Sequence, residues 1–336
     1  MYFNTFFGYL LEQLRRILEE YGFSVTEDQT MVCITTADVP AVITRVFADD
    51  RLSRDEKSNI NVLVLLDGEV ADMTTMQYMK PLVQWYQLVN ASDLVSVIEN
   101  QRIKVLFQPI ISMETRQVYG YECLSRGIAA DGTIISPGKL FGDARELNLL
   151  FNLDRVVREN ALRAAQHQRI DTNVFINFLP TAIYDPEFCL RTTMGVADEV
   201  GLPHDRIVFE IVESERFDDV DHLKKILQYY RSRGVRTALD DVGSGYSSLN
   251  TLATLNPDIM KLDMKLIRNI DSDPLKQSIF DGLDRIARDN GILLLAEGVE
   301  QKSELDFLES RNVSLIQGYY FSRPLETPAY RLPPMD

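Results

Sequence analysis

The pattern of apolar and polar residues differs between the first 92 residues and the rest of the chain. From about Ile103 onward, short apolar strands alternate with segments of helical periodicity. Such alternation is typical of parallel strands joined by crossover helices. The pattern therefore predicts an α/β fold in which a parallel sheet, closed or wound, is covered by helices.

The first 92 residues predict a small α/β domain. Apolar residues recur at helical spacing from Phe7 to Leu18, and Gly22 is placed to end that helix. Asp38 can cap a second helix that runs through Phe47. The remaining expected elements are strands at Phe23–Val25, Met31–Thr35 and Ile60–Leu66, a loop at Asp49–Ser58, a helix at Thr74–Val89 kinked at Pro81, and a connecting helix at Asp93–Asn100.

The length of 336 residues exceeds what one hydrophobic core usually organises. We expect an accessory domain at residues 1–92 and a larger barrel domain at residues 93–336. The first domain carries no catalytic constellation, so a sensing or packing role is expected for it.

Composition excludes several classes of protein. No apolar run approaches 18 residues, and the first residues lack the pattern of a secretory signal, so we expect a cytoplasmic protein without membrane insertion. A net charge of −15 opposes binding to nucleic acid polymers. Three widely spaced cysteines fit reduced thiols better than disulfides or a zinc site.

Polar residues follow seven apolar strands at the point where each strand is expected to end. They are Glu122, Asn177, Glu210, Asp240, Lys261, Glu297 and Gln317. Active sites of (β/α)₈ barrels lie at the carboxyl ends of their strands. Side-chain alternation places Glu122, Glu210 and Glu297 on the strand faces that point into the barrel mouth.

So many converging carboxylates predict bound cations. Oxygen ligands with one Asn amide favour Mg²⁺ or Mn²⁺ over zinc. Asp240 and Asp241 can serve one centre if the strand ends between them, and Gly243 and Gly245 supply the turn. Two ions, with one aspartate bridging, would clamp a phosphate and lower the pKa of a shared water. The candidate ligands are Glu122, Asn177, Glu210, Asp240, Asp241 and Glu297.

These residues lie in motifs that resemble the EAL-domain cyclic di-GMP phosphodiesterases. The resemblance covers about residues 95–330. The matching segments, in order, are Phe107-Gln108-Pro109-Ile110, Gly120-Tyr121-Glu122-Cys123-Leu124-Ser125-Arg126, Ile176-Asn177, Glu210-Ile211-Val212-Glu213-Ser214, Asp240-Asp241, Lys261-Leu262-Asp263, Ala296-Glu297-Gly298-Val299-Glu300, and Gln317-Gly318-Tyr319-Tyr320-Phe321-Ser322-Arg323-Pro324-Leu325.

The resemblance implies a modified TIM barrel whose first strand is antiparallel. It also implies hydrolysis of cyclic di-GMP to linear 5′-pGpG with two divalent metal ions. Family barrels commonly dimerise beside the loop after Asp241, so a homodimer is expected. We further expect residues 1–92 to regulate activity through the Gly243–Ser248 loop.

By the same resemblance, each motif residue has an expected role. Glu122, Asn177, Glu210 and Asp240 would hold one metal, and Asp240, Asp241 and Glu297 would surround the second. Lys261 would position or deprotonate the attacking water, and Arg126 would contact a substrate phosphate. The supporting residues are Glu213, Gln317, which is also expected near the substrate, and Glu300, which would steady the glycine loop.

Three residues depart from the family pattern. Cys123 stands in place of an alanine, Leu179 where a small polar residue is frequent, and Val242 in place of a loop phenylalanine. Cys123 should face away from the mouth and affect packing only. The other two put substrate affinity and loop rigidity in question.

Other interpretations stay open at this point. Lys261 could be a core ion-pair partner, and Glu213 and Gln317 could only bind loops. Asp263 and the histidines are expected to be structural or solvated, and Tyr319, Tyr320 and Phe321 to pack rather than stack on guanine. A catalytically silent cyclic di-GMP receptor would keep the pocket but usually lose metal ligands. A glycosidase could present paired carboxylates but would not need the Asn and Lys.

Overall fold

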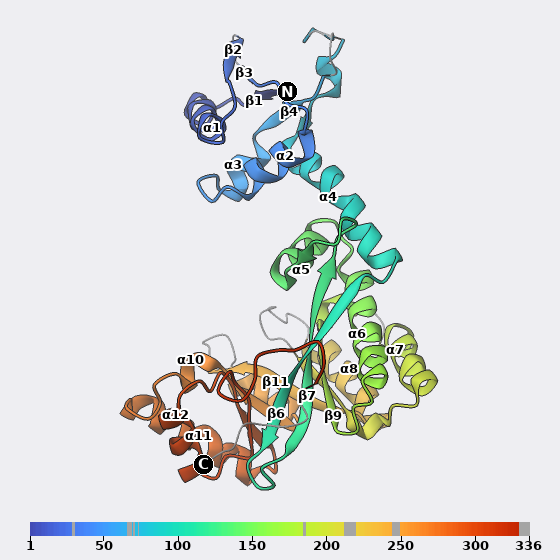
Figure 1. Cartoon of the computed structure of the whole chain (residues 1–336), viewed down its shortest axis with the longest axis vertical. Coiled ribbons are helices and arrows are strands. Elements are labelled where there is room, and N and C mark those ends of the chain that lie inside the picture. The colour runs from blue at the N-terminus through green and yellow to red at the C-terminus, as the bar shows by residue number, and fades with distance from the viewer. Residues whose placement is uncertain are drawn as a thin grey trace. The chain divides into compact units, whose positions relative to one another are not determined.

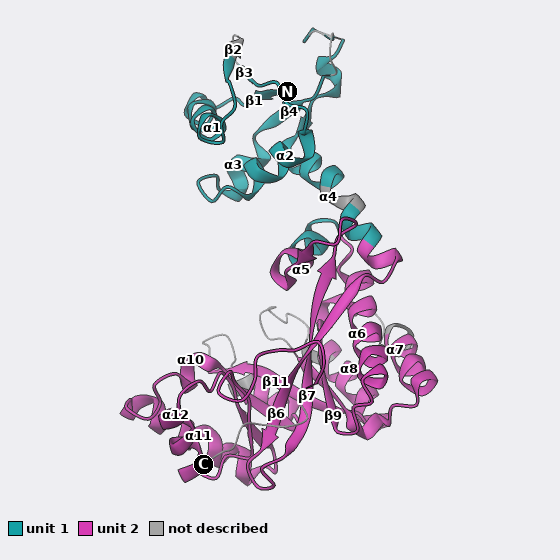
Figure 2. Cartoon of the chain, viewed as in Figure 1, with its two compact units in different colours: residues 1–96, 142–147 teal, residues 97–141, 148–336 magenta. Residues whose placement is uncertain are grey.

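The computed structural model describes residues 1–28, 31–65, 69, 71–72, 74–183, 186–211, 220–243 and 249–328. The chain folds as two compact units, coloured separately in Figure 2. Unit 1 comprises residues 1–96 and 142–147, and unit 2 comprises residues 97–141 and 148–336. The expected accessory role of residues 1–92 stays a prediction.

Unit 1 is built on a five-stranded antiparallel sheet in the order β2-β3-β1-β4-β5. Its elements are β1 (Tyr2–Asn4), α1 (Gly8–Glu20), β2 (Thr26–Asp28), β3 (Met31–Cys33), α2 (Val39–Ala48), α3 (Arg54–Ser58), β4 (Asn61–Leu63), η1 (Met76–Tyr78), β5 (Lys80–Pro81) and α4 (Leu82–Glu99). Apolar side chains of the sheet, α1 and α2 form one hydrophobic core. From β1 to β4, and leaving out the short helix α3, the elements follow the order β-α-β-β-α-β of the split βαβ arrangement.

The two helices expected from periodicity and capping are confirmed. The helix α1 buries Leu10, Leu14, Ile17 and Leu18 on one face. It ends before Gly22, whose φ of +86° is a conformation that glycine adopts without strain. The side chain of Asp38 accepts a hydrogen bond from the Ala41 backbone N–H at 2.9 Å and caps α2.

Three expectations for unit 1 are wrong. The strand expected at Phe23–Val25 begins only at Thr26. The expected loop Asp49–Ser58 contains α3, which a capping box between Ser53 and Glu56 stabilises. The signal for this short helix was therefore present in the sequence.

The expected kinked helix around Pro81 is also wrong. Pro81 ends the edge strand β5, where it pairs with Asn61, and α4 begins one residue later. Proline is tolerated on an edge strand because its missing N–H is not needed there. The Leu82 N–H donates to the Ile60 carbonyl at 2.7 Å, and α4 then continues through the expected connecting helix.

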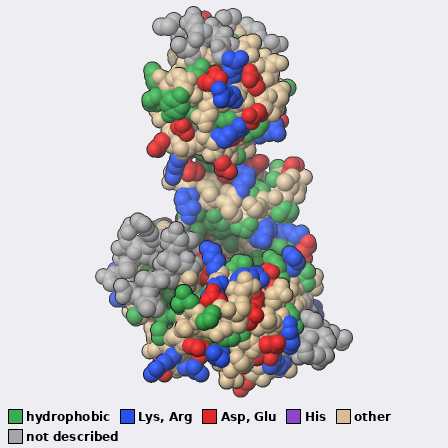
Figure 3. Space-filling view, turned by 90° about the vertical axis from the view of Figure 1, so that its left-hand side faces the viewer, with side chains coloured by type: hydrophobic (Ala, Val, Ile, Leu, Met, Phe, Trp, Pro, Cys, Tyr) green, Lys and Arg blue, Asp and Glu red, His purple; other side chains and the backbone are tan. Residues whose placement is uncertain are grey.

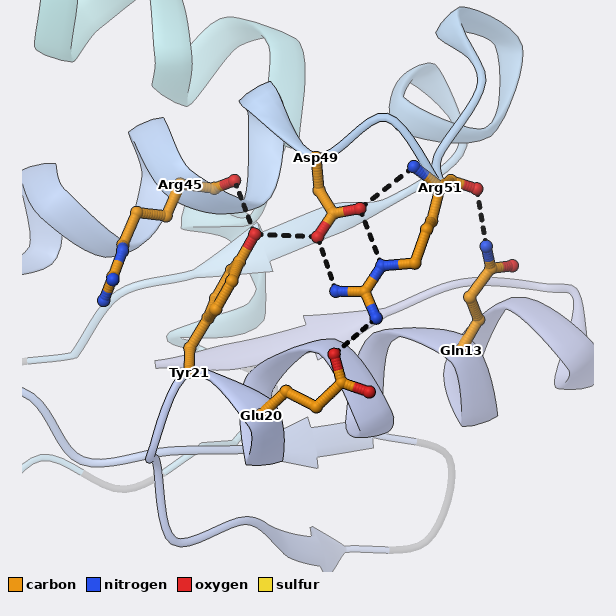
Figure 4. A network of polar contacts seen from close by, with 6 residues as sticks. All are labelled: Gln13, Glu20, Tyr21, Arg45, Asp49 and Arg51. Carbon is orange, nitrogen blue, oxygen red and sulfur yellow. Dashed lines mark hydrogen bonds and ion pairs between the residues drawn. The ribbon is translucent and has the colours of Figure 1, made fainter.

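A polar network in unit 1 joins the end of α1 to the segment after α2 (Figure 4). The Asp49 carboxylate accepts hydrogen bonds from Nε of Arg51 at 2.9 Å, from its terminal nitrogen at 2.7 Å, and from the Tyr21 hydroxyl at 2.7 Å. Glu20 pairs with the same guanidinium at 2.6 Å. The Arg51 guanidinium holds the pKa of Asp49 well below its usual range. The Arg51 guanidinium and the Tyr21 hydroxyl therefore stabilise the ionised form of this nearly buried carboxylate.

Unit 2 is a closed eight-stranded barrel. Going around it, the strand order is β6-β14-β13-β12-β11-β10-β9-β7, and β6 pairs with β7 to close the circle. The strands are β6 (Ile103–Ser112), β7 (Val118–Ile128), β9 (Asn173–Phe178), β10 (Ile207–Ile211), β11 (Arg236–Val242), β12 (Ile259–Leu262), β13 (Leu293–Ala296) and β14 (Leu315–Ile316). Only β6 runs antiparallel to both of its neighbours. The predicted modified TIM barrel is confirmed.

Helices cover the barrel on its outside. The helices α6, α7 and α8 lie on one side of the strands in Figure 1, and α10, α11 and α12 lie on the other. The short strand β8 (Ile134–Ile135) pairs with β7. The helices of this region are α5 (Pro137–Glu146), α6 (Leu150–His167), η2 (Pro180–Ala182), α7 (Pro186–Val200), η3 (His204–Arg206), α8 (Val220–Ser232), α9 (Leu249–Leu255), α10 (Met264–Ile267), α11 (Pro274–Asp289) and α12 (Lys302–Ser310).

Strand alternation divides the apolar residues of unit 2 between two cores. Inward residues such as Phe175, Val208 and Leu295 fill the barrel, and outward residues pack against the helices. Cys123 and Val242 both belong to the outer core, as strand alternation predicts for Cys123. The residues that remain inward at the strand ends are the polar ones.

Figure 3 shows acidic and basic side chains interspersed on the face that it draws. This view has no continuous basic surface of the kind that binds a polynucleotide backbone. No helix among the described residues has both the length and the apolar character needed to span a bilayer.

Candidate active site

The site is centred on the buried ammonium group of Lys261, near the end of β12. Only 1% of the lysine is exposed. Its Nζ lies 2.7 Å from Glu210 Oε1, 2.7 Å from Glu297 Oε1, 3.2 Å from Asp240 Oδ1 and 3.9 Å from Glu122 Oε1. Four carboxylates from four strands or strand ends therefore converge on one cation.

Glu122 is held by two neutral side chains. The Gln317 amide Nε2 donates to Glu122 Oε2 at 2.6 Å, and the Asn177 amide Nδ2 donates to Glu122 Oε1 at 3.3 Å. Glu122 lies in the middle of β7 rather than at its end, because β7 continues to Ile128 beside the antiparallel β6. The predicted residues Glu122, Asn177 and Gln317 are thus brought together.

The adjacent aspartates lie at an irregularity of β11. The register with β12 shifts between Leu239 and Val242, and Asp241 has a φ of +57°. The Asp241 backbone N–H donates to Asp240 Oδ1 at 2.9 Å. Asp and Asn adopt this left-handed conformation more readily than other non-glycine residues, because their short polar side chains can hydrogen-bond locally. The expectation that the strand ends between the two aspartates is wrong: β11 continues to Val242, and the irregularity at Asp241 redirects the chain within the strand.

The site opens to a pocket of about 260 Å³. Its lining includes seven of the predicted site residues, namely Glu122, Asp240, Asp241, Lys261, Glu297, Glu300 and Gln317. Gly318 also lines it, and a Cβ there would meet the Val299 carbonyl oxygen at 2.0 Å. Only glycine allows the two strand-end loops to approach so closely.

Of the two predicted residues Arg126 and Glu300, Arg126 is not part of the pocket lining, whereas Glu300 is. Arg126 lies four residues beyond Glu122 on β7, and its guanidinium donates to the Ser125 carbonyl at 2.8 Å. The carboxylate of Glu300 pairs with Arg268 at 2.8 Å. Glu213 and residues 244–248 of the glycine loop lie outside the described residues.

Asp263 and Tyr319 are among the pocket residues to which the sequence reasoning assigned no role. Asp263 caps α10 by accepting the Lys265 N–H at 2.7 Å, lines the pocket, and hydrogen-bonds Asp241. Tyr319 was expected to pack, but it is 47% exposed at the pocket with the Arg323 guanidinium over its ring at 4.4 Å. The spacing Lys261-x-Asp263 was the available signal for the first.

The crowding of acidic groups changes their protonation. Burial, and then the charges of Asp240 and Glu122, raise the pKa of Glu297 to about 8, although Lys261 opposes the shift. Burial, the charge of Asp240 and a hydrogen bond with Asp263 raise the pKa of Asp241 to about 6. Burial also raises the pKa of Glu210. Burial alone would lower the pKa of Lys261, but the surrounding carboxylates outweigh it and raise that pKa.

The donor set suits a hard divalent cation. Glu210 is fully buried, and its Oε2 has no hydrogen-bond donor among the described residues, so a ligand role would satisfy it. However, no three described His, Cys, Asp or Glu side chains are arranged around one metal position. They converge on the Lys261 ammonium instead. The predicted ligand set of Glu122, Asn177, Glu210, Asp240, Asp241 and Glu297 therefore stays a prediction.

Known proteins share both this sequence and this architecture. The sequence model of the EAL domain matches residues 91–324. The probable cyclic di-GMP phosphodiesterase PdeG of Escherichia coli is 30% identical over 234 residues, which cover 68% of this chain and 46% of PdeG. The matched region of this chain covers between 29% and 59% of the length of curated relatives such as PdeG.

Solved structures give the same family. A standalone EAL protein of Vibrio cholerae O395 in its c-di-GMP-bound form superposes with a TM-score of 0.64 at 40% identity, over 69% of this chain and 96% of that one. The YkuI protein of Bacillus subtilis, in complex with substrate c-di-GMP and calcium, superposes with a TM-score of 0.60 at 28% identity, over 71% of this chain and 60% of that one. The barrel of this chain belongs to the EAL domain family.

Proposed function

We propose that this chain hydrolyses cyclic di-GMP to linear 5′-pGpG with the help of Mg²⁺ or Mn²⁺. The observation that carries the proposal is the convergence of Glu122, Glu210, Asp240 and Glu297 on Lys261 beside an open pocket. Relatives named as cyclic di-GMP phosphodiesterases and neighbours solved with c-di-GMP support the choice of substrate.

The charge balance of the cluster supports a role for added cations. Four carboxylates face a single ammonium, which is more acid than one ion pair requires. Removing charges from water costs several kcal/mol per ion unless each is compensated. An anionic phosphodiester would add to this negative charge. Divalent cations would compensate the acids and the substrate together.

Glu122, Asn177, Glu210 and Asp240 are the residues that would hold one cation, and Asp240, Asp241 and Glu297 those near a second. Such ions supply a water of lowered pKa and neutralise the phosphate. Both Mg²⁺ and Mn²⁺ accept such oxygen donors.

The protein side chains around the pocket would then position the attacking water and keep the acidic side chains oriented. Lys261, held on several sides by carboxylates, would position the attacking water and stabilise the negative charge that develops on the phosphate. Gln317 would keep the Glu122 carboxylate oriented through its 2.6 Å hydrogen bond. The expected roles of Arg126 toward a substrate phosphate and of Glu213 and Glu300 as supporting residues are part of the proposal.

A catalytically silent cyclic di-GMP receptor is the alternative that uses the same pocket. It would bind the nucleotide without needing Lys261 or the full set of acidic residues. Every acidic residue of the expected set is present in the sequence, which favours the hydrolase.

We also propose a cytoplasmic homodimer regulated through residues 1–92. The dimer follows from the family resemblance, and the regulatory role from an accessory unit whose described residues lack the acidic cluster of the barrel. Turnover of the full chain and of a chain beginning near Ala91, with mass measured by light scattering, tests both. Equal specific activities would favour a packing role, and a monomeric mass would exclude the dimer.

One assay tests the main proposal. The full chain is incubated with cyclic di-GMP and either Mg²⁺ or Mn²⁺, and the products are separated by chromatography. Accumulation of 5′-pGpG is expected. Binding of cyclic di-GMP without any product would contradict hydrolysis and support the receptor.

A further inference from the structure

A buried acidic side chain holds the end of β9 from outside the barrel. The carboxylate of Asp154, on α6, accepts the backbone N–H of Leu179 at 3.0 Å through Oδ1. Its Oδ2 accepts Nε of Arg158 at 2.9 Å. Asp154 is 1% exposed and Arg158 is fully buried. An ion pair therefore lies in the apolar layer between barrel and helices.

Stability alone does not explain such a pair. Replacing a buried ion pair by apolar residues of similar volume is often neutral or stabilising, because burial of the charges is costly. The Arg158 guanidinium also donates to the Thr193 hydroxyl on α7, and its second terminal nitrogen has no acceptor among the described residues. A role in fixing the end of β9 accounts for the ion pair better than a gain in stability does.

The position that it fixes is that of Asn177. Leu179 follows Asn177 by two residues and immediately follows the last residue of β9. Asn177 points into the mouth, where its amide donates to Glu122 Oε1 at 3.3 Å. A backbone N–H fixed at Leu179 limits how far the strand end, and with it the Asn177 amide, can rotate.

Aromatic packing on the outer face supports the same element. Phe178, which follows Asn177, packs edge-to-face on Phe209 with ring centroids 5.9 Å apart. Phe209, which precedes Glu210, stacks on Tyr230 at 4.2 Å. Because strand side chains alternate, ordering these outward rings orders the inward Asn177 and Glu210.

We propose, resting on the proposed function, that Asp154 is a positioning residue for the metal ligands at the mouth. It acts through the Leu179 backbone amide on Asn177, and Arg158 orients its carboxylate. Partners that orient metal ligands are typically worth 10- to 100-fold in metal affinity or activity.

A matched pair of double variants isolates the contact. Asp154→Leu/Arg158→Met removes both charges and the acceptor for the Leu179 N–H. Asp154→Asn/Arg158→Met removes the charges but keeps an acceptor oxygen, and Asn and Leu have similar shape. Both replace the ion pair without leaving one charge uncompensated, so both are expected to fold. Thr193→Val is the control, since it removes a partner of Arg158 and leaves the Asp154 to Leu179 contact in place.

The measurement is the Kd for Mn²⁺ in the full chain without substrate, from the paramagnetic resonance signal of free Mn²⁺, with the melting temperature recorded in parallel. The Leu/Met variant is expected to bind Mn²⁺ at least 10-fold more weakly than the Asn/Met variant at a similar melting temperature. Thr193→Val should bind it within about 3-fold of the original chain.

Equal Mn²⁺ affinities in the two double variants would overturn the positioning role. The same conclusion would follow if Thr193→Val weakened binding as much as the Leu/Met variant. If the original chain bound Mn²⁺ but produced no 5′-pGpG, hydrolysis would be excluded while the affinities still decided the role of Asp154. Absence of saturable Mn²⁺ binding by the original chain would exclude the metal site and this role together.

Discussion

The two ends of the barrel surround their basic side chains with different partners: Arg236 is half-buried among uncharged groups, and Lys261 is buried among carboxylates. At the amino-terminal end of β11, Arg236 donates to the Tyr119 hydroxyl at 2.6 Å and to the Asn173 amide oxygen, both of which are neutral. At the carboxyl end of β12, Lys261 faces four carboxylates. One end of the barrel thus holds a single guanidinium hydrogen-bonded to uncharged groups, and the other end holds an acidic cluster around one ammonium.

The difference distinguishes polar residues that support the fold from polar residues that form a binding site. The Arg236 cluster satisfies a few hydrogen-bonding groups and leaves no excess of acid. The Lys261 cluster contains more acid than its one base can compensate, and the pKa values of Glu297 and Glu210 are raised as a result of burial and mutual repulsion. Such an excess destabilises the fold unless something else binds there, and this is the mark of a site.

Removing an acid from the carboxyl end should have the largest effect. We expect Glu122→Ala to lower hydrolysis of cyclic di-GMP by more than about 100-fold, because the carboxylate is expected to bind metal directly and its orienting partners alone are typically worth 10- to 100-fold. Product chromatography measures the rate, and circular dichroism checks folding. A folded variant with near-normal turnover would remove Glu122 from the site.

Lys261, at the centre of the acidic cluster, should affect the rate of hydrolysis more than the binding of cyclic di-GMP. Lys261→Ala is expected to lower kcat by about 100-fold or more with a smaller change in KM, because a group acting on the attacking water contributes mainly in the transition state. Steady-state kinetics with saturating Mn²⁺ separates the two constants. A rise in KM alone would reassign Lys261 to substrate positioning.

The acidic excess should make the metal-free protein less stable as pH rises. Glu297, with its pKa raised to about 8, keeps a proton in the folded state that the unfolded state releases above its ordinary pKa of 4.5. The folded state therefore binds more protons in this window, and the free energy of unfolding falls with increasing pH, by up to about 1.4 kcal/mol per pH unit from this group.

Urea unfolding in the presence of a chelator at pH 5.5 and pH 7.5 measures this slope. Glu297→Gln should flatten it, because the amide does not titrate. A slope that the substitution leaves unchanged would mean that Glu297 is ionised throughout and that the acid cluster is already compensated.

The smallest effect on activity is expected at the other end of the barrel. Arg236→Met should lower the free energy of unfolding by about 1–3 kcal/mol, since it leaves the Tyr119 hydroxyl and the Asn173 oxygen without their donor. Turnover per folded molecule should stay within about 2-fold, because surroundings distant from the reacting groups affect stability first. Loss of activity comparable with that of Lys261→Ala would contradict the contrast between the two ends.

The periodicity of the strands was enough to predict that three glutamates meet at the mouth. Because side chains alternate, the inward positions of Glu122, Glu210 and Glu297 followed from the apolar residues beside them. The antiparallel first strand came from the family resemblance, and the pattern alone did not distinguish it. It is also the reason that β7 runs past Glu122, since pairing with β6 continues for five more residues along the strand, to Gly127.

What the sequence could not supply depended on tertiary contacts. Without the pairing of β5 with β4, the sequence around Pro81 predicts a kinked helix. The left-handed φ of Asp241 could not be predicted, because that position is not a glycine. The contact from Asp154 to the end of β9 joins residues 25 positions apart through a backbone N–H. Which carboxylates face Lys261 rather than one another is set by packing in the barrel mouth.

The most direct test of the central claim is the rate of cyclic di-GMP hydrolysis after removal of metal and during its return. Full-length protein treated exhaustively with a chelator should show no turnover, and added Mn²⁺ or Mg²⁺ should restore it along a saturable curve. Ca²⁺ should restore it poorly, because it prefers more ligands at longer distances. Undiminished turnover after complete chelation would contradict the claim that the acidic cluster around Lys261 is a catalytic metal site.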